Sequence, residues 1–464
     1  MNRTKKLFSN FAVFIVGNLG SKLISFLMVP LYTYYLNSKQ FGTVDLLLTT
    51  INLCLPLITF SLFDAVFRFV MDKDIDNVKV ISTGFFTTLV LFALSVVLFP
   101  ILSIFNIPYL VLFFLILFVT ATFTMFQNYV RASGSSRIFA FSGVINTLVF
   151  ASTNLILLVF FNGGVRAYLG SYLVAIIVAT LYIVFRTHLW KTIKLTEFSY
   201  SLLKRMLKYS VPLIPNSLAW WFTNDSSRYF ILIFVGISGN GLFAVANKIP
   251  TIINMFFSVF TQAWQISAVD EFKSSDNESY YSDVFEKLLR FLFLLVYGIM
   301  FVLKPAMKLL FDANYYIAWQ YVPILLIAVL LADASAFLGT IYLAAEKTAN
   351  VFSTTVLGMV VNVLLGALLT PAIGIFGTGI SMSLGFLVVI MLRLRSVKTF
   401  VEVKMPWKVF SILLIDFLIM YGGLFIKNSG IEYAVLVMGL TVAFIVNFNF
   451  ISSAFHAMRS ILKK

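Results

Sequence analysis

Apolar stretches long enough to cross a bilayer recur along the whole 464-residue chain, from Phe11 to Phe455, with only brief polar interruptions between them. The hydrocarbon core of a bilayer is about 30 Å thick, so a helix needs about 20 predominantly apolar residues to span it. Only 11% of the residues are charged and the mean hydropathy is +0.97, whereas about 25% of the residues are charged in a soluble domain. The sequence therefore predicts an all-α, polytopic membrane protein.

These stretches predict about fourteen transmembrane helices, and an even number places both termini on one side of the membrane. We expect a first six-helix lobe over residues 1–190, a basic linker over 191–208, a second six-helix lobe over 209–400, and two further helices over 401–464. The expected spans are roughly 11–36, 43–70, 80–105, 109–130, 138–161, 167–185, 209–235, 241–268, 286–303, 319–344, 350–371, 374–392, 408–426 and 433–454.

The net charge of +15 arises from 34 Lys and Arg against 19 Asp and Glu. In a soluble protein this excess would suggest a nucleic-acid partner, but in a membrane protein basic residues are retained in cytoplasmic loops. With a cytoplasmic N-terminus, 25 of the 34 basic residues fall in loops on that side and five fall outside. We therefore expect cytoplasmic termini and no nucleic-acid partner. The four remaining basic residues lie within expected spans: Lys22, Arg68, Arg228 and Lys248.

The longest connection, roughly 186–208, is strongly basic. Its apolar residues recur at helical spacing opposite the basic ones, so this segment is either an amphipathic helix on the membrane surface or an ordinary positively charged linker. The apolar positions are Leu195, Phe198, Leu202 and Met206, and the basic positions are Lys204, Arg205 and Lys208.

Few residues in the chain point to catalysis. The two histidines, His188 and His456, have no metal-ligand partner at zinc-type spacing, and the single Cys54 lies in an apolar stretch. The glycines of Gly236–Gly241 join two spanning helices instead of a strand and a helix, so they do not predict a nucleotide site. The loops are too short for an inserted catalytic domain. We expect a protein that is not an enzyme and has no metal or cofactor.

Weak internal matches suggest that the two halves are repeats in one orientation. Gly42 lies 199 residues before Gly241, Tyr129 lies 213 before Tyr342, and the Gly164-Val165 pair lies 210 before Gly374-Ile375. Transporters built from parallel halves place their substrate between them. The order of these matches predicts two six-helix lobes related as parallel pseudo-repeats, with the last two helices outside the repeat.

Two lysines within the spans are the main candidates for binding an anion. A charged side chain costs about 2.5–3.5 kcal/mol at a helix centre, so it usually faces a polar cavity. Lys22 lies about eleven residues, or about 16 Å, into its span, which places it near the midplane. Lys248 lies in the eighth span within Asn247-Lys248-Ile249-Pro250, where the proline can open the backbone.

Acidic residues in the spans form a second set of candidates. Asp64 and Arg68 are four residues apart on one helix face, and Asp225 and Arg228 are three apart, so each pair is either a local ion pair or part of a polar wall. No opposite charge lies one turn from Asp333 or Asp416, which leaves protonation, a bound cation or pairing across helices. The candidates for a cavity wall or for coupling to an ion gradient are Asp45, Asp64, Asp225, Asp333 and Asp416.

Two motifs carry a resemblance to a known family. The first runs from Gly17-Asn18-Leu19-Gly20-Ser21-Lys22 through Pro30-Leu31-Tyr32 to Phe41-Gly42-Thr43-Val44-Asp45, and the second is Gly374-Ile375-Phe376-Gly377-Thr378-Gly379. They resemble the opening helices and the twelfth-helix entry of the polysaccharide-unit flippases in the multidrug/oligosaccharidyl-lipid/polysaccharide exporter superfamily. The resemblance extends in topology over nearly the whole chain.

The resemblance implies two lobes in a V around a central cavity, plus two terminal helices, and the export of undecaprenyl-pyrophosphate-linked sugar units across the bacterial cytoplasmic membrane. Lys22 and Lys248 would hold the pyrophosphate, since they match by helix the cavity cations of related peptidoglycan-precursor flippases. Arg68 does not match in depth, and Arg228 is its possible substitute. The implied partners are membrane lipids, the lipid-linked substrate, and the polymerase and glycosyltransferases of the same pathway.

Two alternatives remain open from the sequence. A multidrug antiporter would share the fold but would change drug resistance on expression. A membrane polymerase or glycosyltransferase would be expected to carry a sizeable outer loop or an acidic catalytic motif, and neither is visible in the sequence. Coupling to a proton gradient, a sodium gradient or the membrane potential is compatible with each transporter.

Overall fold

The computed structural model describes residues 20–72, 74–272, 276–345, 347–453 and 456. Within these ranges the chain is helical and contains no strand, as the apolar pattern predicts. Contacts divide the chain into two units, Met1–Asp225 with Ile237–Gly241, and Ser226–Gly236 with Leu242–Lys464. These units are defined by contacts and are not the same segments as the predicted lobes, whose boundaries stay predictions.

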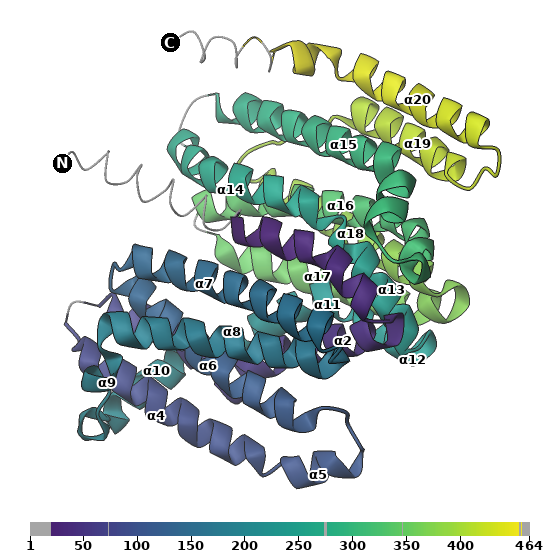
Figure 1. Cartoon of the computed structure of the whole chain (residues 1–464). Helices are drawn as coiled ribbons and strands as arrows, with labels where there is room; N and C mark the ends of the chain where they lie inside the picture. Colours follow the sequence, from purple (N-terminus) through teal and green to yellow (C-terminus); the bar gives the residue numbers. More distant parts are fainter. Residues whose placement is uncertain (1–19, 73, 273–275, 346, 454–455, 457–464) are drawn as a thin grey trace. The chain divides into compact units, whose positions relative to one another are not determined.

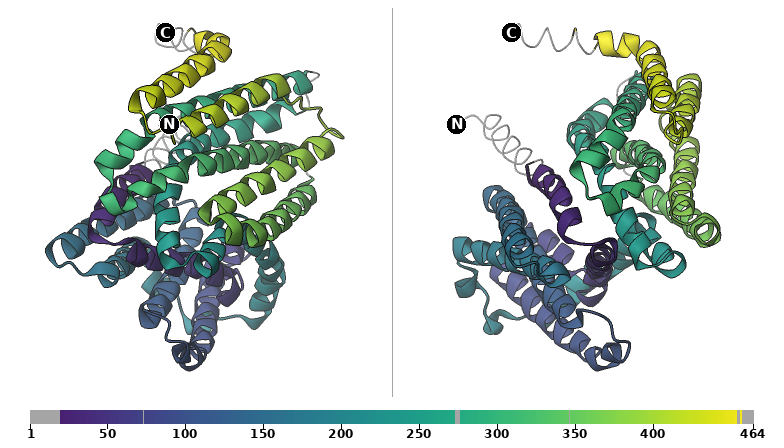
Figure 2. Two further views of the ribbon diagram at one scale, coloured as in Figure 1. Left: turned by 90° about the vertical axis from the view of Figure 1, so that its right-hand side faces the viewer. Right: turned by 45° about the vertical axis from the view of Figure 1, so that its right-hand side comes forward.

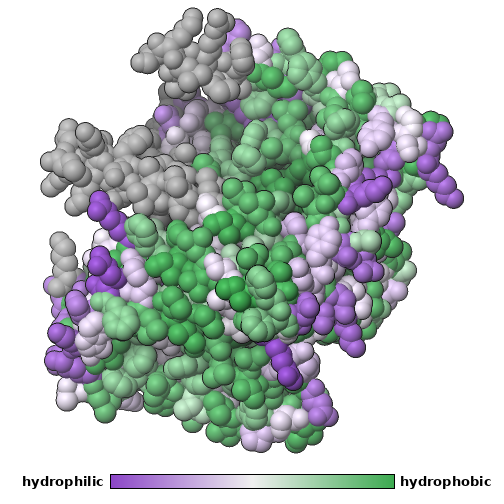
Figure 3. Space-filling view, viewed as in Figure 1, coloured by the Kyte–Doolittle hydropathy of each residue, from purple (hydrophilic) through white to green (hydrophobic). Residues whose placement is uncertain are grey.

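The first unit begins with a helix over residues 20–35. Its remaining elements are α2 (Ser38–Ile58), α3 (Leu62–Val70), α4 (Asn77–Val96), α5 (Phe99–Ile104), α6 (Leu110–Ala132), α7 (Ser136–Asn154), the π-helix η1 (Leu155–Phe160), α8 (Gly164–Thr187), α9 (Leu189–Thr192), η2 (Leu195–Glu197), α10 (Tyr200–Ser210), η3 (Val211–Leu213) and α11 (Ile214–Asp225) (Figure 1). On the face seen in Figure 3, apolar residues cover the middle of these helices and hydrophilic residues gather at their ends.

The second unit contains α12 (Ser227–Phe234), most of α13 (Ile237–Lys248), α14 (Thr251–Glu271), α15 (Asn277–Leu310), η4 (Ala313–Gln320), α16 (Val322–Ala344), α17 (Thr348–Ile373), α18 (Ile375–Val397), α19 (Trp407–Gly423) and α20 (Ser429–Val446). The last two helices, α19 and α20, pack side by side (Figure 2). Two polar contacts tie α20 to the long helix α15. Arg290 donates to the carbonyl of Val446 over 2.7 Å, and Lys304 pairs with Glu432 at 2.9 Å.

Ten helices in the described residues are long and apolar enough to cross a membrane, or eleven if one bent pair counts as a span. The fourteen predicted spans are therefore not all recovered. The first predicted span begins outside the described residues, α19 has only 17 residues, and the seventh is divided by a 3₁₀ turn at Val211–Leu213 and a second break at Ser226. The second predicted span also ends early, because Phe60 and Ser61 adopt positive φ between α2 and α3.

The glycines that match between the two halves lie at positions where the structure requires glycine. Gly42 of α2 and Gly241 of α13 pack against each other within the first unit, and a β-carbon on Gly241 would overlap the backbone oxygen of Ser38. Gly164 and Gly374, at the starts of α8 and α18, both have positive φ, +56° and +62°, a conformation that favours glycine. The matched positions therefore share backbone requirements as well as residue type.

Replacing Gly241 with Ala should destabilise the protein by about 1–3 kcal/mol, because the added methyl group has no space beside the α2 backbone. Thermal unfolding of the detergent-solubilised protein measures the loss. Gly143→Ala is the matched control, since a β-carbon on that α7 glycine meets nothing within 4 Å and alanine favours a helix by about 1 kcal/mol. Equal stability of the two variants would contradict the close α2–α13 contact.

Candidate functional site

The two lysine candidates lie in different units. Lys22 is half-buried near the start of the helix over residues 20–35, in the first unit. Lys248 is half-buried at the end of α13, in the second unit. Both residues take part in interactions within the described structure. Their joint action on one ligand stays a prediction.

The backbone at Lys248 opens as its neighbouring proline predicts. Helices α13 and α14 meet at a 45° bend, and Pro250, which has no backbone N–H to donate, precedes the first residue of α14. The hydroxyl of Thr251 donates to the carbonyl of Lys248 and so satisfies one of the carbonyls freed by the break. The break makes Lys248 a helix-terminal residue.

The two arginine candidates differ in exposure. Arg68 is exposed in the last turn of α3, which agrees with its predicted position near the end of its span. Arg228 is half-buried on α12, and its guanidinium lies 5.7 Å from the centre of the Phe243 ring on α13. Because α13 also ends at Lys248, the structure associates Arg228 with the helix that carries the second-unit lysine, whereas Arg68 belongs to the first unit.

The acidic candidates of the first unit lie on three helices. Asp45 of α2 is half-buried and accepts from the side-chain amide of Asn240 at 3.5 Å, beside the Gly42 crossing. Asp64 is half-buried in the first turn of α3. No ion pair joins it to Arg68 in the described structure, although their spacing allows one. Asp225 ends α11.

Asp333 of α16 and Asp416 of α19 are the two most deeply buried acidic candidates, with 5% and 6% of their surface exposed. In each carboxyl group the Oδ2 atom is buried and has no hydrogen-bond partner among the described residues. Tyr297 lies beside Asp416, but its hydroxyl donates to the carbonyl of Leu413 at 2.6 Å. Each aspartate therefore keeps an oxygen atom that can carry a proton or contact a cation.

A buried arginine that the sequence assigned to a cytoplasmic loop lies inside the second unit. Arg393 belongs to α18 and only 5% of its surface is exposed. Its guanidinium donates to the hydroxyls of Thr354 at 3.2 Å and Thr355 at 3.0 Å, both on α17, and to the carbonyl of Ser335 on α16. One side chain thus joins three helices. The sequence signal for this contact was the pair Thr354-Thr355, which places two hydroxyl groups in an otherwise apolar span.

Removing the Arg393 guanidinium should reduce stability by about 1–3 kcal/mol, because hydrogen bonds from a charged donor are among the stronger ones and the buried acceptors lose a partner. We expect Arg393→Met to lower the midpoint of thermal unfolding and Arg393→Lys to restore it only in part, since an ammonium lacks the planar fork of donors. Arg395→Met is the control, because Arg395 is exposed two residues away. A variant as stable as this control would contradict the three-helix role.

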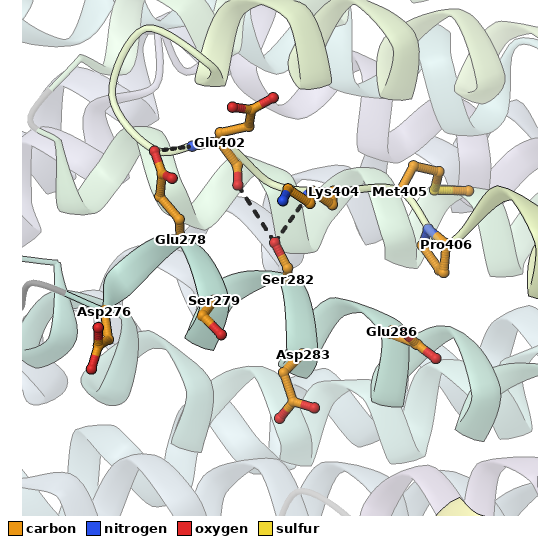
Figure 4. A pocket seen from close by; sticks show the side chains of 10 residues that line it. All are labelled: Asp276, Glu278, Ser279, Ser282, Asp283, Glu286, Glu402, Lys404, Met405 and Pro406. Carbon is orange, nitrogen blue, oxygen red and sulfur yellow. Dashed lines mark hydrogen bonds between the residues drawn. The ribbon is translucent and has the colours of Figure 1, made fainter.

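A cavity of about 580 Å³ in the second unit is lined mainly by acidic residues. It lies between the start of α15 and the extended segment 401–406, whose backbone bonds to Ser282 and Glu278 (Figure 4). The pKa of the Glu402 carboxyl is lowered by its hydrogen bond with Lys398, which is 2.9 Å away. This cavity contains none of the predicted site residues, and its negative charge makes it unsuited to a pyrophosphate.

No group of three or more His, Cys, Asp or Glu side chains is arranged to hold a metal ion within the described ranges. Each unit, described by itself, has half-buried basic and acidic side chains on its helices, and the second unit also has the deeply buried carboxyls of Asp333 and Asp416. Such side chains suit the recognition of an anionic group and the binding of a coupling ion.

Comparison with known proteins gives the chain a family. A family model described as polysaccharide biosynthesis protein matches residues 7–265, which is more than half of the chain. No curated protein sequence matches it.

Solved structures show the same fold at low sequence identity. The structure entitled lipid II flippase MurJ, in an inward closed conformation, aligns with a TM-score of 0.72 and 12% identity over 96% of this chain and all of that one. Inward-facing and outward-facing structures of a multidrug resistance MATE family transporter of the MOP superfamily align with TM-scores of 0.61 and 0.59, at 14% and 15% identity, over 84% of this chain and 93% of theirs.

These matches confirm the predicted fold class and the predicted resemblance. The helices, the apolar spans and the family model agree on a multi-pass membrane protein with the fold of lipid flippases and multidrug transporters. The chain belongs to the family described as polysaccharide biosynthesis protein.

Proposed function

We propose that the protein is a flippase that moves undecaprenyl-pyrophosphate-linked oligosaccharide units across the bacterial cytoplasmic membrane for polysaccharide synthesis. The carrying observation is the combination of a polysaccharide biosynthesis family with a fold that aligns along nearly the whole chain with a lipid II flippase. A lipid flippase must hold a charged head group while the polyprenyl tail stays in the bilayer. Half-buried lysines on membrane helices supply the required positive charge.

In this proposal, Lys22 and Lys248 bind the pyrophosphate and Arg228 supports them from α12. Arg68 is exposed at the end of α3, so in this proposal it contributes less to pyrophosphate binding than Arg228 does. The head group enters from the cytoplasm, the two lobes change their relative orientation, and the head group leaves on the outer side. Both termini are cytoplasmic in this scheme, and the polymerase and glycosyltransferases of the same pathway are the partners.

The test is complementation of a bacterial host that lacks the gene, with surface polysaccharide as the measurement. Lys22→Ala or Lys248→Ala should lower polymer by about 10–100-fold, because a hydrogen bond to a charged group contributes about 1.5–3 kcal/mol. The corresponding Glu variants should abolish polymer through repulsion. Lys39→Ala is the control, since Lys39 is an exposed residue in the first turn of α2.

Two results would contradict this assignment. Undiminished polymer at normal protein levels would exclude Lys22 and Lys248 as pyrophosphate ligands. No complementation by the wild type, together with increased drug resistance on its expression, would favour the second candidate function, a multidrug antiporter. That alternative is supported by the alignments with multidrug transporters over 84% of the chain.

We also propose that Asp333 and Asp416 couple transport to a proton or sodium gradient, because each has a buried oxygen atom without a hydrogen-bond partner in the described structure. Asp45, Asp64 and Asp225 are the further candidates. No cofactor takes part in this proposal.

The coupling proposal predicts that Asp333→Asn and Asp416→Asn remove most of the stimulation of transport by an imposed gradient, since an amide does not titrate and lacks the negative charge that attracts sodium. Uptake of the lipid-linked substrate into proteoliposomes, with and without each gradient, measures the stimulation. Asp283→Asn is the control, because Asp283 is exposed and already paired with Lys287. Full stimulation in both buried variants would exclude these residues as coupling sites.

A further inference from the structure

The segment that follows α8 is fixed to the first unit by hydrogen bonds from its backbone. Ser82 and Thr83 of α4 are fully buried, and their hydroxyls accept from the backbone N–H groups of Lys194 and Ser199, each over 3.1 Å. Elements α9, η2 and α10 therefore form a docked surface beside the start of α4 (Figure 1). Of the predicted amphipathic stretch only the second half is an α-helix, α10, whose Leu202 and Met206 pack against protein, whereas Leu195 and Phe198 precede it.

The apolar residues of this segment divide into two sets. Leu202 and Met206 of α10, with Leu189 of α9, are buried in the core of the first unit. A second set is not covered by the fold, although it includes two large aromatic rings. Its exposed fractions are 47% for Trp190, 69% for Leu195 and 75% for Tyr200. The buried set fixes the segment and leaves the second set facing outward.

Basic residues alternate along the sequence with the exposed apolar residues. Six of them are exposed between residues 186 and 208, and Glu197 is the single acidic residue in that range. None of the six forms an ion pair in the described structure, and Arg205 lies 5.6 Å from the centre of the Phe69 ring. We define the linker surface as Arg186, Trp190, Lys191, Lys194, Leu195, Tyr200, Lys204, Arg205 and Lys208.

The position of the linker surface decides which partner it fits. It directly follows the last turn of the membrane-spanning helix α8, at the level where apolar helix gives way to polar loop. Tryptophan and tyrosine are enriched at this boundary because their rings are amphipathic. Clustered lysines and arginines there attract anionic lipids. A water-facing loop would need the basic residues but not the exposed rings.

We propose that the linker surface binds anionic phospholipid head groups of the adjoining leaflet, with Trp190, Leu195 and Tyr200 inserted at the boundary and the basic side chains on the phosphates. This role goes beyond substrate translocation and does not depend on which substrate is moved. It gives the segment between the two predicted lobes a fixed depth in the membrane.

The test uses the full-length protein in nanodiscs that contain phosphatidylglycerol and phosphatidylcholine, and counts the phosphatidylglycerol molecules enriched around the protein. The variant Arg186→Gln, Lys191→Gln, Lys194→Gln should lose preference for phosphatidylglycerol by about fivefold for each side chain removed, and high salt should weaken the wild-type preference. The matched control is Lys287→Gln, Lys398→Gln, Lys404→Gln, which removes the same charge, two of the three positions being in ion pairs.

A second measurement is independent of the two charge variants and needs only one conservative substitution, Trp190→Phe. Brominated phosphatidylglycerol should quench the fluorescence of wild-type protein more than that of Trp190→Phe, while brominated phosphatidylcholine should show a smaller difference. Equal loss of preference in the two charge variants would indicate a general charge effect and overturn the proposal. The proposal would also be overturned if the wild type showed no preference for phosphatidylglycerol, or if both proteins were quenched equally. Either result would indicate a protein, and not a lipid, as the partner of the linker surface.

Discussion

A bilayer does not solvate charges or open backbone groups, and this constraint explains the charged contacts between helices of the second unit. Arg393 illustrates it most clearly, because its guanidinium is satisfied by two threonine hydroxyls and a backbone carbonyl from two neighbouring helices. Lys304 and Glu432 neutralise each other between α15 and α20. Arg290 satisfies carbonyl and side-chain oxygens at the end of α20. In each case a charge costly to bury holds helices together.

The same constraint separates structural charges from candidate functional ones. Arg393 is buried and its donors have acceptors, so it serves the fold. Asp333 and Asp416 are buried to the same extent, yet each keeps an oxygen atom without a partner in the described residues. A protein that needed these carboxyls only for stability would have no reason to leave those oxygen atoms unsatisfied. This contrast supports a role for the two aspartates in ion coupling.

Much of the architecture could be predicted because bilayer spanning imposes a strong length and composition signal. The fold class and the family follow from apolar periodicity and a few glycine motifs. Helix breaks were harder to predict. Pro250 predicts the bend after Lys248, whereas Phe60 and Ser61 are not residue types that predict a helix break. Arg393 was placed in a loop because hydropathy counts a charge as a span end, whereas the structure satisfies it with hydroxyls on α17.

The glycines at the starts of α8 and α18 have a consequence for the comparison of the two predicted halves. Since positive φ disfavours every other residue type, Gly164 and Gly374 resist substitution independently in each half. Neighbouring positions are free to diverge until the halves share little sequence. These two glycines are therefore the natural anchor positions for aligning the two predicted halves of this chain with each other.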